Sequence, residues 1–232
     1  FADIFVAQIS NAGMERMKSE LVDAIVKVFK PSGVLFKNDG KMRVVEGLDS
    51  YVEVAYGEVP DRVPLRENGV AFEALVRDGQ KTGWFYDQRR NRNFVASLAK
   101  DASVADFFCY GGGFAIQALC AGAARAVMVD GSAPALEAAM ESAARNGVDS
   151  RCSTVKADAF EEMQRLADAG ERFDIVIADP PAFVRTRKDQ RAGGRAYRKM
   201  ARFAARLVAP GGILFVASCS HHMTPELFRD AV

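Results

Sequence analysis

From about Lys81 onward, short apolar runs alternate with longer segments of helical composition. The apolar runs are strand-like and read SVADFF, AVMVD, STVKAD, FDIVIAD and GILFVAS. Between two of them lies an alanine-rich segment, residues 133–146, that has the composition of a helix. Such alternation is typical of a parallel, doubly wound α/β sheet. Ligands of these sheets bind beyond the carboxyl ends of the strands, so the residues that end each strand are the candidate functional residues.

The first eighty residues predict a small α+β unit instead. A strand at IFVAQI is followed by a helix over residues 11–30, with Asn11 as its N-cap and Pro31 after its end. Further strand-like runs are GVLFK, YVEVAYGEV and GVAFEALV, and the alternation at residues 51–56 predicts a sheet with one solvent-facing side. These residues form no catalytic constellation, which favours a supporting or substrate-docking role. We therefore expect two domains, residues 1–80 and residues 81–232.

Composition limits the class of protein. The chain has 232 residues, of which 49% are hydrophobic, and no apolar run approaches the roughly 20 residues that cross a bilayer. Its first residues have neither a basic start nor a cleavage site, so we expect a cytoplasmic protein without a membrane partner. The four cysteines lie far apart with no CxxC pair, which speaks against a zinc ribbon or a disulfide framework. Reduced thiols and no metal are expected.

Positive charge is concentrated although the net charge is only +1. Residues 185–206 contain nine basic residues and a single acidic one, Asp189. The basic residues are Arg185, Arg187, Lys188, Arg191, Arg195, Arg198, Lys199, Arg202 and Arg206. A second basic cluster is DQRRNR, residues 87–92. Such runs are often the solvated face of a helix. The alternative is a surface that meets phosphates, which the neighbouring motifs favour.

The ends of the first three strands suggest a ligand that contains adenosine. Gly111, Gly112 and Gly113 predict a tight turn that lets the backbone approach a ligand. The dinucleotide pattern GxGxxG fails because Ile116 occupies the place of its third glycine. Asp130 is placed to accept hydrogen bonds from a ribose diol. Asp158 is placed to accept one from an adenine amine, with helix capping as the alternative for both acids.

The fourth strand ends in ADPPAF, the most specific local signal. Pro180 and Pro181 donate no backbone hydrogen bonds, so they predict a rigid turn with outward carbonyls beside Asp179. Carbonyl acceptors next to an acid suit a planar base that bears an amino group, with Phe183 available to lie against its face. A purely structural turn is the alternative. The basic stretch that follows would then lie at the rim of the same pocket.

The last strand is followed by SCSHH, which contains Cys219 and both histidines of the chain. A small residue in a buried strand is one interpretation of Cys219. The other is a nucleophile at the carboxyl end of a strand. His221 and His222 are expected to be exposed loop residues, with proton transfer as the alternative.

Taken together, the motifs GQKTGWFYDQRRNR, DFFCYGGGF, VMVDGS, IADPPAF and ASCS resemble those of a known family. They are similar, in this order and spacing, to the class I S-adenosylmethionine-dependent methyltransferases of the large-subunit ribosomal RNA cytosine-C5 family (RlmI-type). The resemblance runs from FVAQIS to the end. It implies a seven-stranded, Rossmann-like methyltransferase domain behind a small α+β domain of EEHEE type. Family members carry an RNA-binding PUA domain before this region and further strands after it, so both domains are expected to be truncated.

The resemblance also implies S-adenosyl-L-methionine as cofactor and RNA, above all large-subunit ribosomal RNA, as partner; a homodimer is left open. The candidate cofactor-binding residues are Gln88, Arg89, Phe108, Tyr110, Gly112, Gly113, Asp130, Gly131, Ser132, Asp158, Ala159 and Asp179. The candidate substrate-binding residues are Pro180, Pro181, Phe183, Arg185, Arg187, Lys188 and Arg195. Gly111 stands where the family commonly has threonine, and Cys109 where it has serine.

The expected chemistry assigns catalysis to Cys219 and Asp179. Carbon 5 of cytosine is a poor nucleophile until a thiolate adds to carbon 6. Cys219 would supply the thiolate, Asp179 would bond ring N3, and the Pro180 carbonyl would receive the exocyclic amine. One competing hypothesis is an N-methyltransferase that acts on a base or a protein side chain and needs no thiol. Others are an inactive RNA-binding module and, more distantly, a nicotinamide dehydrogenase.

Overall fold

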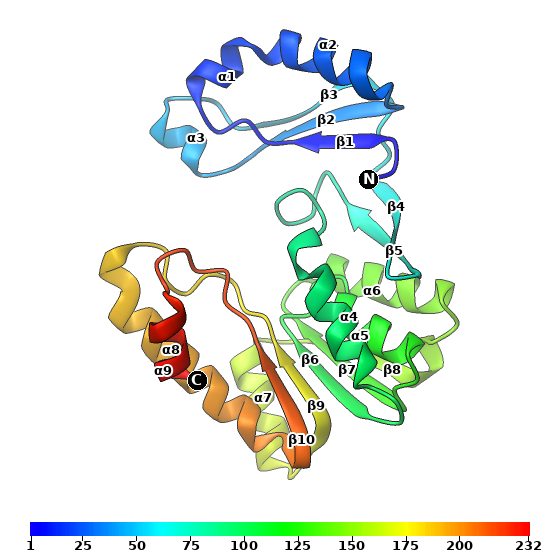
Figure 1. Cartoon of the computed structure of the whole chain (residues 1–232), viewed down its shortest axis with the longest axis vertical. Helices are drawn as coiled ribbons and strands as arrows, with labels where there is room; N and C mark the ends of the chain where they lie inside the picture. The colour runs from blue at the N-terminus through cyan, green and yellow to red at the C-terminus, as the bar shows by residue number, and fades with distance from the viewer. The chain divides into compact units, whose positions relative to one another are not determined.

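The computed structural model describes every residue from Phe1 to Val232 (Figure 1). The chain divides into two compact units, Phe1–Asp87 and Gln88–Val232. The alternation of strand-like and helical segments, which starts near Lys81 in the sequence, therefore begins inside the first unit. None of the helices combines the length and the apolar character that a membrane span requires.

The first unit contains a three-stranded sheet and a separate hairpin. The sheet has the order β1-β2-β3, in which β1 and β2 are parallel and β2 and β3 antiparallel. Its strands are β1 (Ile4–Ala7), β2 (Gly33–Asn38) and β3 (Tyr51–Gly57). Its helices are α1 (Ala12–Arg16), α2 (Lys18–Phe29) and α3 (Met42–Val45), and the hairpin pairs β4 (Arg62–Glu67) with β5 (Val70–Leu75). The central strand β2 is buried along its whole length.

Two local expectations for this unit were wrong. The helix expected over residues 11–30 is two helices, because the backbone leaves helical geometry at Met17, although Asn11 does cap the first by accepting from the Met14 N–H at 2.9 Å. The alternation expected in β3 is broken, since the neighbours Val52 and Glu53 are both exposed and the next two residues are both half-buried. The pairing with β2 shifts register between Val34 and Leu35, and such a bulge interrupts the alternation of sides.

The second unit is built on a five-stranded parallel sheet in the order β10-β9-β6-β7-β8. Its strands are β6 (Ser103–Phe107), β7 (Arg125–Asp130), β8 (Cys152–Lys156), β9 (Phe173–Ala178) and β10 (Val208–Val216). All five expected runs form strands, so the parallel α/β sheet predicted from the sequence is confirmed. The sheet has five strands where the family resemblance implied seven.

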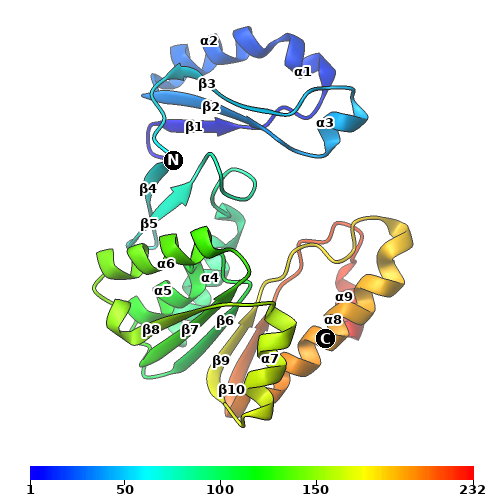
Figure 2. The same ribbon diagram turned by 180° about the vertical axis from the view of Figure 1, so that it is seen from behind.

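Helices cover both faces of this sheet (Figures 1 and 2). On one face lie α4 (Arg89–Ser97), α5 (Gly113–Cys120) and α6 (Ala133–Arg145). On the other lie α7 (Ala159–Asp168), α8 (Gln190–Arg206) and α9 (Pro225–Ala231). Single-turn 3₁₀ helices occur at Tyr86–Gln88, Asp149–Arg151 and Arg187–Asp189. Successive side chains of β6 point to opposite faces of the sheet. Phe107 packs in the core with residues of α7 and α8, whereas Asp106 lies on the face covered by α5.

Candidate active site

Asp130, Asp179 and Cys219 stand at or just beyond the carboxyl ends of β7, β9 and β10. In a parallel sheet these ends share one edge, and Ala217 extends the pairing by donating its N–H to the Ala178 carbonyl at 3.0 Å. Cys219 therefore lies beside the Asp179-Pro180 segment.

The turn between β6 and α5 has an unusual backbone. Gly112 has φ of 70° and N-caps α5, and a Cβ there would come within 2.7 Å of the Met128 sulfur. Phe108 and Tyr110 also have positive φ values, of 60° and 49°. A left-handed conformation costs a non-glycine residue about 1–2 kcal/mol. The sequence correctly predicted a glycine turn, but two of its left-handed positions carry large side chains, which no glycine signal could reveal.

Asp130 holds two turns together. Its Oδ2 accepts from the Tyr110 N–H at 2.9 Å, and its Oδ1 accepts from the Ser132 N–H, also at 2.9 Å. The carboxylate thus fixes the β6–α5 turn against the β7–α6 turn. Each carboxylate oxygen has a further lone pair, so the hydrogen bonds expected with a ribose diol are compatible with this role.

Asp158 is the N-cap of α7. Its Oδ1 accepts from the N–H groups of Phe160 and Glu161 at 2.9 and 3.1 Å. Helix capping, the alternative weighed against an adenine contact, is therefore present. The carboxylate is exposed and keeps its second oxygen, so the adenine contact stays a prediction.

Asp106 is a buried acid that the sequence reasoning missed. It is 1% exposed, and its Oδ2 accepts from the Ala115 N–H of α5 at 3.1 Å, whereas its Oδ1 has no hydrogen-bond partner. Burial raises the pKa of Asp106 to about 8, against the lowering effect of the Ala115 hydrogen bond, and the nearby carboxylates Asp179 and Asp130 also raise it. An acid inside the apolar run SVADFF was the available signal.

Asp179 is half-buried and accepts a hydrogen bond from Gln88, whose Nε2 lies 3.0 Å from Oδ2. This bond joins the start of α4 to the end of β9 and brings together two residues that were predicted to share a site. Arg89, the first residue of α4, is exposed. Pro180 is buried and Pro181 is exposed.

Cys219 is exposed, and its sulfur lies 3.8 Å from the Pro180 carbonyl oxygen. None of the four cysteines forms a disulfide. Cys109, the nearest rival in the sequence, is buried, and that burial raises the pKa of its thiol well above the usual value. Cys152 begins β8, at the opposite end of the strand from the candidate residues, and Cys120 ends α5. Only Cys219 combines exposure with a position beyond a strand's carboxyl end.

Phe183 belongs to an aromatic cluster. Its ring centroid lies 4.8 Å from that of Tyr197 and 5.9 Å from that of Phe160. The ring is half-buried, so part of its surface is already packed against protein. Stacking of Phe183 on a substrate base stays a prediction.

The basic run divides into two parts. Arg185, Arg187, Lys188 and Arg195 are exposed, on the segment after the Pro-Pro turn and on the first half of α8. Toward the far end of α8, Arg206 pairs with Asp168 at 2.7 Å, and the Lys199 ammonium lies over the Phe160 and Phe203 rings at 5.3 and 5.4 Å. In the second half of the basic run, some cations thus lie on a solvated helix face and are engaged by neighbouring side chains, which is the alternative to a phosphate-binding surface. His221 and His222 lie in the loop before α9 with ring centroids 5.2 Å apart.

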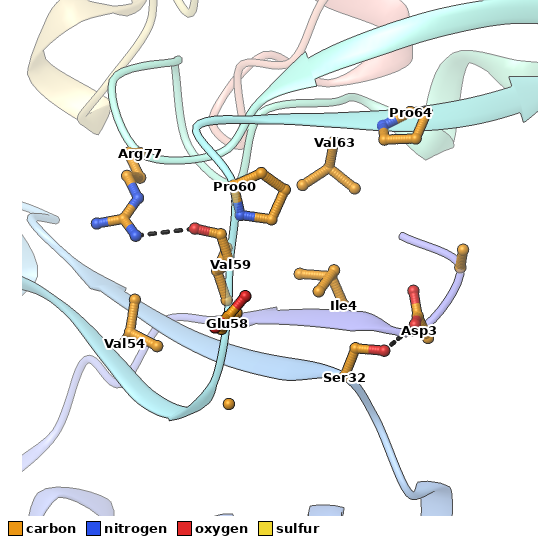
Figure 3. A pocket seen from close by; sticks show the side chains of 12 residues that line it. Asp3, Ile4, Ser32, Val54, Glu58, Val59, Pro60, Val63, Pro64 and Arg77 are labelled. Carbon is orange, nitrogen blue, oxygen red and sulfur yellow. Dashed lines mark hydrogen bonds between the residues drawn. The ribbon is translucent and has the colours of Figure 1, made fainter.

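The first unit has a hollow of about 790 Å³ (Figure 3). It is lined by Ala2, Asp3, Ile4, Ser32, Val54, Gly57, Glu58, Val59, Pro60, Val63, Pro64 and Arg77. Several of its polar groups are engaged, since the Ser32 hydroxyl donates to Asp3 and Arg77 donates to the Val59 carbonyl at 2.8 Å. Arg77 also pairs with Asp61 at 2.9 Å. The lining contains no cysteine or histidine. The strand ends of the second unit, which gather several acids and an exposed thiol, are the better candidate site.

Comparisons with known proteins show which family the chain resembles. The family model of S-adenosylmethionine-dependent methyltransferases matches residues 38–231. A protein named Ribosomal RNA large subunit methyltransferase I from Pseudoalteromonas atlantica is 36% identical over 233 residues, which are 100% of this chain and 59% of that protein. Its namesake from Vibrio vulnificus is 36% identical over 236 residues, with the same coverage. The chain thus spans about three fifths of the length of these relatives.

A crystal structure of SMU.776 complexed with SAH shares the fold. It superimposes with a TM-score of 0.85 at 24% identity, over 99% of this chain and 59% of that one. The family model and the two relatives confirm the family resemblance predicted from the motifs.

Proposed function

Because this chain belongs to the family of S-adenosylmethionine-dependent methyltransferases, we propose that it methylates carbon 5 of a cytosine in large-subunit ribosomal RNA, with Cys219 as the nucleophile. The names of the relatives support the RNA substrate. The observation that carries the chemistry is the exposed thiol of Cys219 beside the Pro180 carbonyl, 3.8 Å away, at the strand ends where such sheets bind ligands.

The side chains at these strand ends fit the methyl donor. S-adenosylmethionine carries an ammonium group and a sulfonium, together with a ribose diol and an adenine amine. The second unit places the carboxylates of Asp130 and Asp179 close enough to the buried Asp106 to raise its pKa, and Asp158 presents a further exposed acceptor. Acids stabilise cations and accept from hydroxyl and amine donors. When bound, the cofactor supplies an electrophilic methyl group.

Gln88 and the β6–α5 turn complete the proposed cofactor site. Gln88 holds Asp179 by its side-chain amide, and Asp130 holds Tyr110 and Ser132 by their backbone amides. These bonds fix the acids before any ligand arrives. A preorganised set of acceptors binds without a reorganisation cost.

The role of Cys219 is to activate the pyrimidine ring. The thiolate adds to carbon 6, so a C–S bond forms as the double bond between carbons 5 and 6 opens. Carbon 5 becomes nucleophilic and would take the methyl group, whose bond to the sulfonium sulfur would break to leave the neutral thioether. The carbon-5 proton then leaves to a base, and the electrons of that C–H bond restore the ring double bond as the C–S bond breaks and the thiolate departs. A protonated Asp179 would donate a hydrogen bond to N3 and so stabilise the negative charge that develops on the ring, while the Pro180 carbonyl accepts a hydrogen bond from the exocyclic amine.

Substrate contacts are assigned to the segment after the Pro-Pro turn. Arg185, Arg187, Lys188 and Arg195 are exposed cations that suit RNA phosphates, which position the strand without reading its sequence. Pro181 and Phe183 provide apolar surface at the same place. The target base must leave a duplex if it is paired, because carbon 6 is inaccessible within a base stack.

Methyl transfer from labelled S-adenosylmethionine to large-subunit ribosomal RNA tests the proposal. Wild-type protein is expected to methylate one cytosine at carbon 5, and Cys219→Ala to lose transfer by at least about a thousandfold. Cys120→Ala, which removes another exposed thiol, is the matched control and should retain activity. Full activity of Cys219→Ala would point to N-methylation, which needs no thiol. Failure to bind S-adenosylmethionine in calorimetry would favour an inactive RNA-binding module.

A further inference from the structure

The hydroxyl of Tyr197 connects α8 to the loop that carries Cys219. Tyr197 is fully buried, and its oxygen lies 2.7 Å from the Ser218 hydroxyl and 2.9 Å from the Ser220 hydroxyl. These two serines flank Cys219 in the sequence. A single phenol therefore holds the chain on both sides of the exposed thiol.

The same network extends to the Pro-Pro turn. Ser220 is 6% exposed, and its hydroxyl oxygen accepts from the Val184 N–H at 3.0 Å, while the Ser220 N–H donates to the Ser218 hydroxyl oxygen at 3.2 Å. Gly193 of α8 packs directly against this turn, since a Cβ there would clash with the Val184 side chain and the Phe183 carbonyl. The segments after β9 and β10 are thus tied to each other and to α8.

The ring of Tyr197 is anchored independently of its hydroxyl. Its centroid lies 4.8 Å from that of Phe183 and 5.3 Å from that of Phe228. Met200 and Ala204, on the same helix, belong to the same core cluster. Packing thus fixes the ring, so loss of the hydroxyl alone should leave the fold intact and release only the loop.

We propose that Tyr197 is a positioning residue that holds Cys219 beside the Pro180 carbonyl through Ser218 and Ser220. This inference rests on the proposed function. Side chains in a catalytic constellation must be held closely, and a displacement of about 1 Å can lower a rate by about a hundredfold. Tyr197 itself is buried beneath the loop and acts through its neighbours.

The test compares Tyr197→Phe with wild type. The variant is expected to lose kcat for RNA methylation by about tenfold to a hundredfold, with an unchanged KM for S-adenosylmethionine and a melting temperature within a few degrees of wild type. Tyr51→Phe removes a tyrosine hydroxyl in the first unit, where it donates to Glu15 at 2.6 Å, and serves as the matched control with unchanged kcat.

A double-mutant cycle separates positioning from a general structural effect. Ser218→Ala and Tyr197→Phe both remove the Tyr197–Ser218 contact, so the double variant should lose less kcat than the two single losses combined. Hydrogen exchange should accelerate in peptides covering residues 181–186 and 215–222 and stay unchanged in the strands β6, β7 and β8. Additive losses in kcat, or unchanged exchange in both peptides, would overturn the inference.

The two proposals fail in different ways. If Cys219→Ala is fully active, the nucleophile is wrong and the positioning role falls with it. If Cys219→Ala is inactive and Tyr197→Phe keeps the wild-type kcat, the proposed function stands and the positioning role of Tyr197 alone is overturned.

Discussion

Asp106 places a carboxyl group in the interior, against the N-terminus of α5. One oxygen accepts the Ala115 N–H and the other has no partner. A buried charge without full compensation is unfavourable, which is why the pKa of Asp106 rises to about 8. Near neutral pH the group is therefore mostly protonated, and a neutral carboxyl can donate a hydrogen bond from the oxygen that lacks a partner.

The raised pKa makes stability depend on pH. Between 3.8 and about 8 the folded protein keeps a proton on Asp106 that the unfolded chain has released. The free energy of unfolding should thus fall as pH rises through this window, by at most about 1.4 kcal/mol per pH unit from this group. Asp106→Asn should remove this fall, as measured by urea unfolding between about pH 5 and pH 8.

Asp174→Asn is the control for that series. Hydrogen bonds from the Ser103 N–H and hydroxyl lower the pKa of Asp174, so its contribution changes only in more acidic solution. Its stability profile between about pH 5 and pH 8 should parallel that of wild type. Parallel profiles for wild type and Asp106→Asn would contradict the assignment.

For single residues, the sequence predicted which side chains lie at the strand ends better than it predicted their hydrogen-bond partners. The strand-end rule located Asp130, Asp179 and Cys219, because chain order alone fixes which residues follow a strand. It could not show that both Asp130 oxygens hold backbone amides, since those partners, Tyr110 and Ser132, belong to two different turns. Such contacts depend on how the turns pack.

At the scale of elements, the helix α7 depends on its cap. The Asp158 carboxylate satisfies two N–H groups that have no partner within the helix. The same residue is proposed to contact the cofactor. The two roles differ in what they require, because capping needs an oxygen acceptor and the cofactor contact is strengthened by charge.

Two substitutions of Asp158 distinguish these roles. Asp158→Ala should lower the free energy of unfolding by about 1 kcal/mol through loss of the cap. Asp158→Asn keeps an oxygen acceptor and should remain nearly as stable as wild type, yet bind S-adenosylmethionine more weakly. Thermal unfolding and calorimetry measure the two effects. Equal cofactor affinity in Asp158→Asn and wild type would limit the residue to capping.

The missed strand β4 had a recognisable signal. Asn68 and Gly69 lie between β4 and β5 with φ values of 51° and 85°, as a two-residue hairpin turn requires. Pro64 made residues 62–67 look unlike a strand, because proline cannot donate a hydrogen bond to a neighbouring strand. Proline is nevertheless tolerated at strand positions that need no such bond. The break between α1 and α2 at Met17 had no such signal, because the apolar spacing continues across it.

At the scale of the whole molecule, all the candidate cofactor, substrate and catalytic residues fall within Gln88–Val232. This follows from the topology, since the parallel sheet that gathers strand ends belongs entirely to this unit. Charge is distributed unevenly in the same unit. The net charge of +1 conceals the exposed cations after the Pro-Pro turn.

RNA affinity should therefore depend on salt and on one part of the basic run. Replacing Arg185, Arg187 and Lys188 together with Gln should weaken RNA binding and reduce the slope of log K against log salt by about 2. Arg202→Gln with Arg206→Gln, at the far end of α8, is the matched control and should change the slope little. Filter binding over a salt series measures both. Equal slopes in the two variants would contradict the assigned surface.

The transient bond between Cys219 and a pyrimidine is the central claim of this account. RNA that contains 5-fluorocytosine tests it most directly, because fluorine cannot leave as a proton does and the protein stays attached. Mass spectrometry of the digested complex, formed with S-adenosylmethionine, should find the nucleotide on the peptide that contains Cys219. The adduct should be absent in Cys219→Ala and present in Cys120→Ala. Attachment to another cysteine, or methylation of ordinary RNA without any adduct on the fluorinated RNA, would contradict the claim.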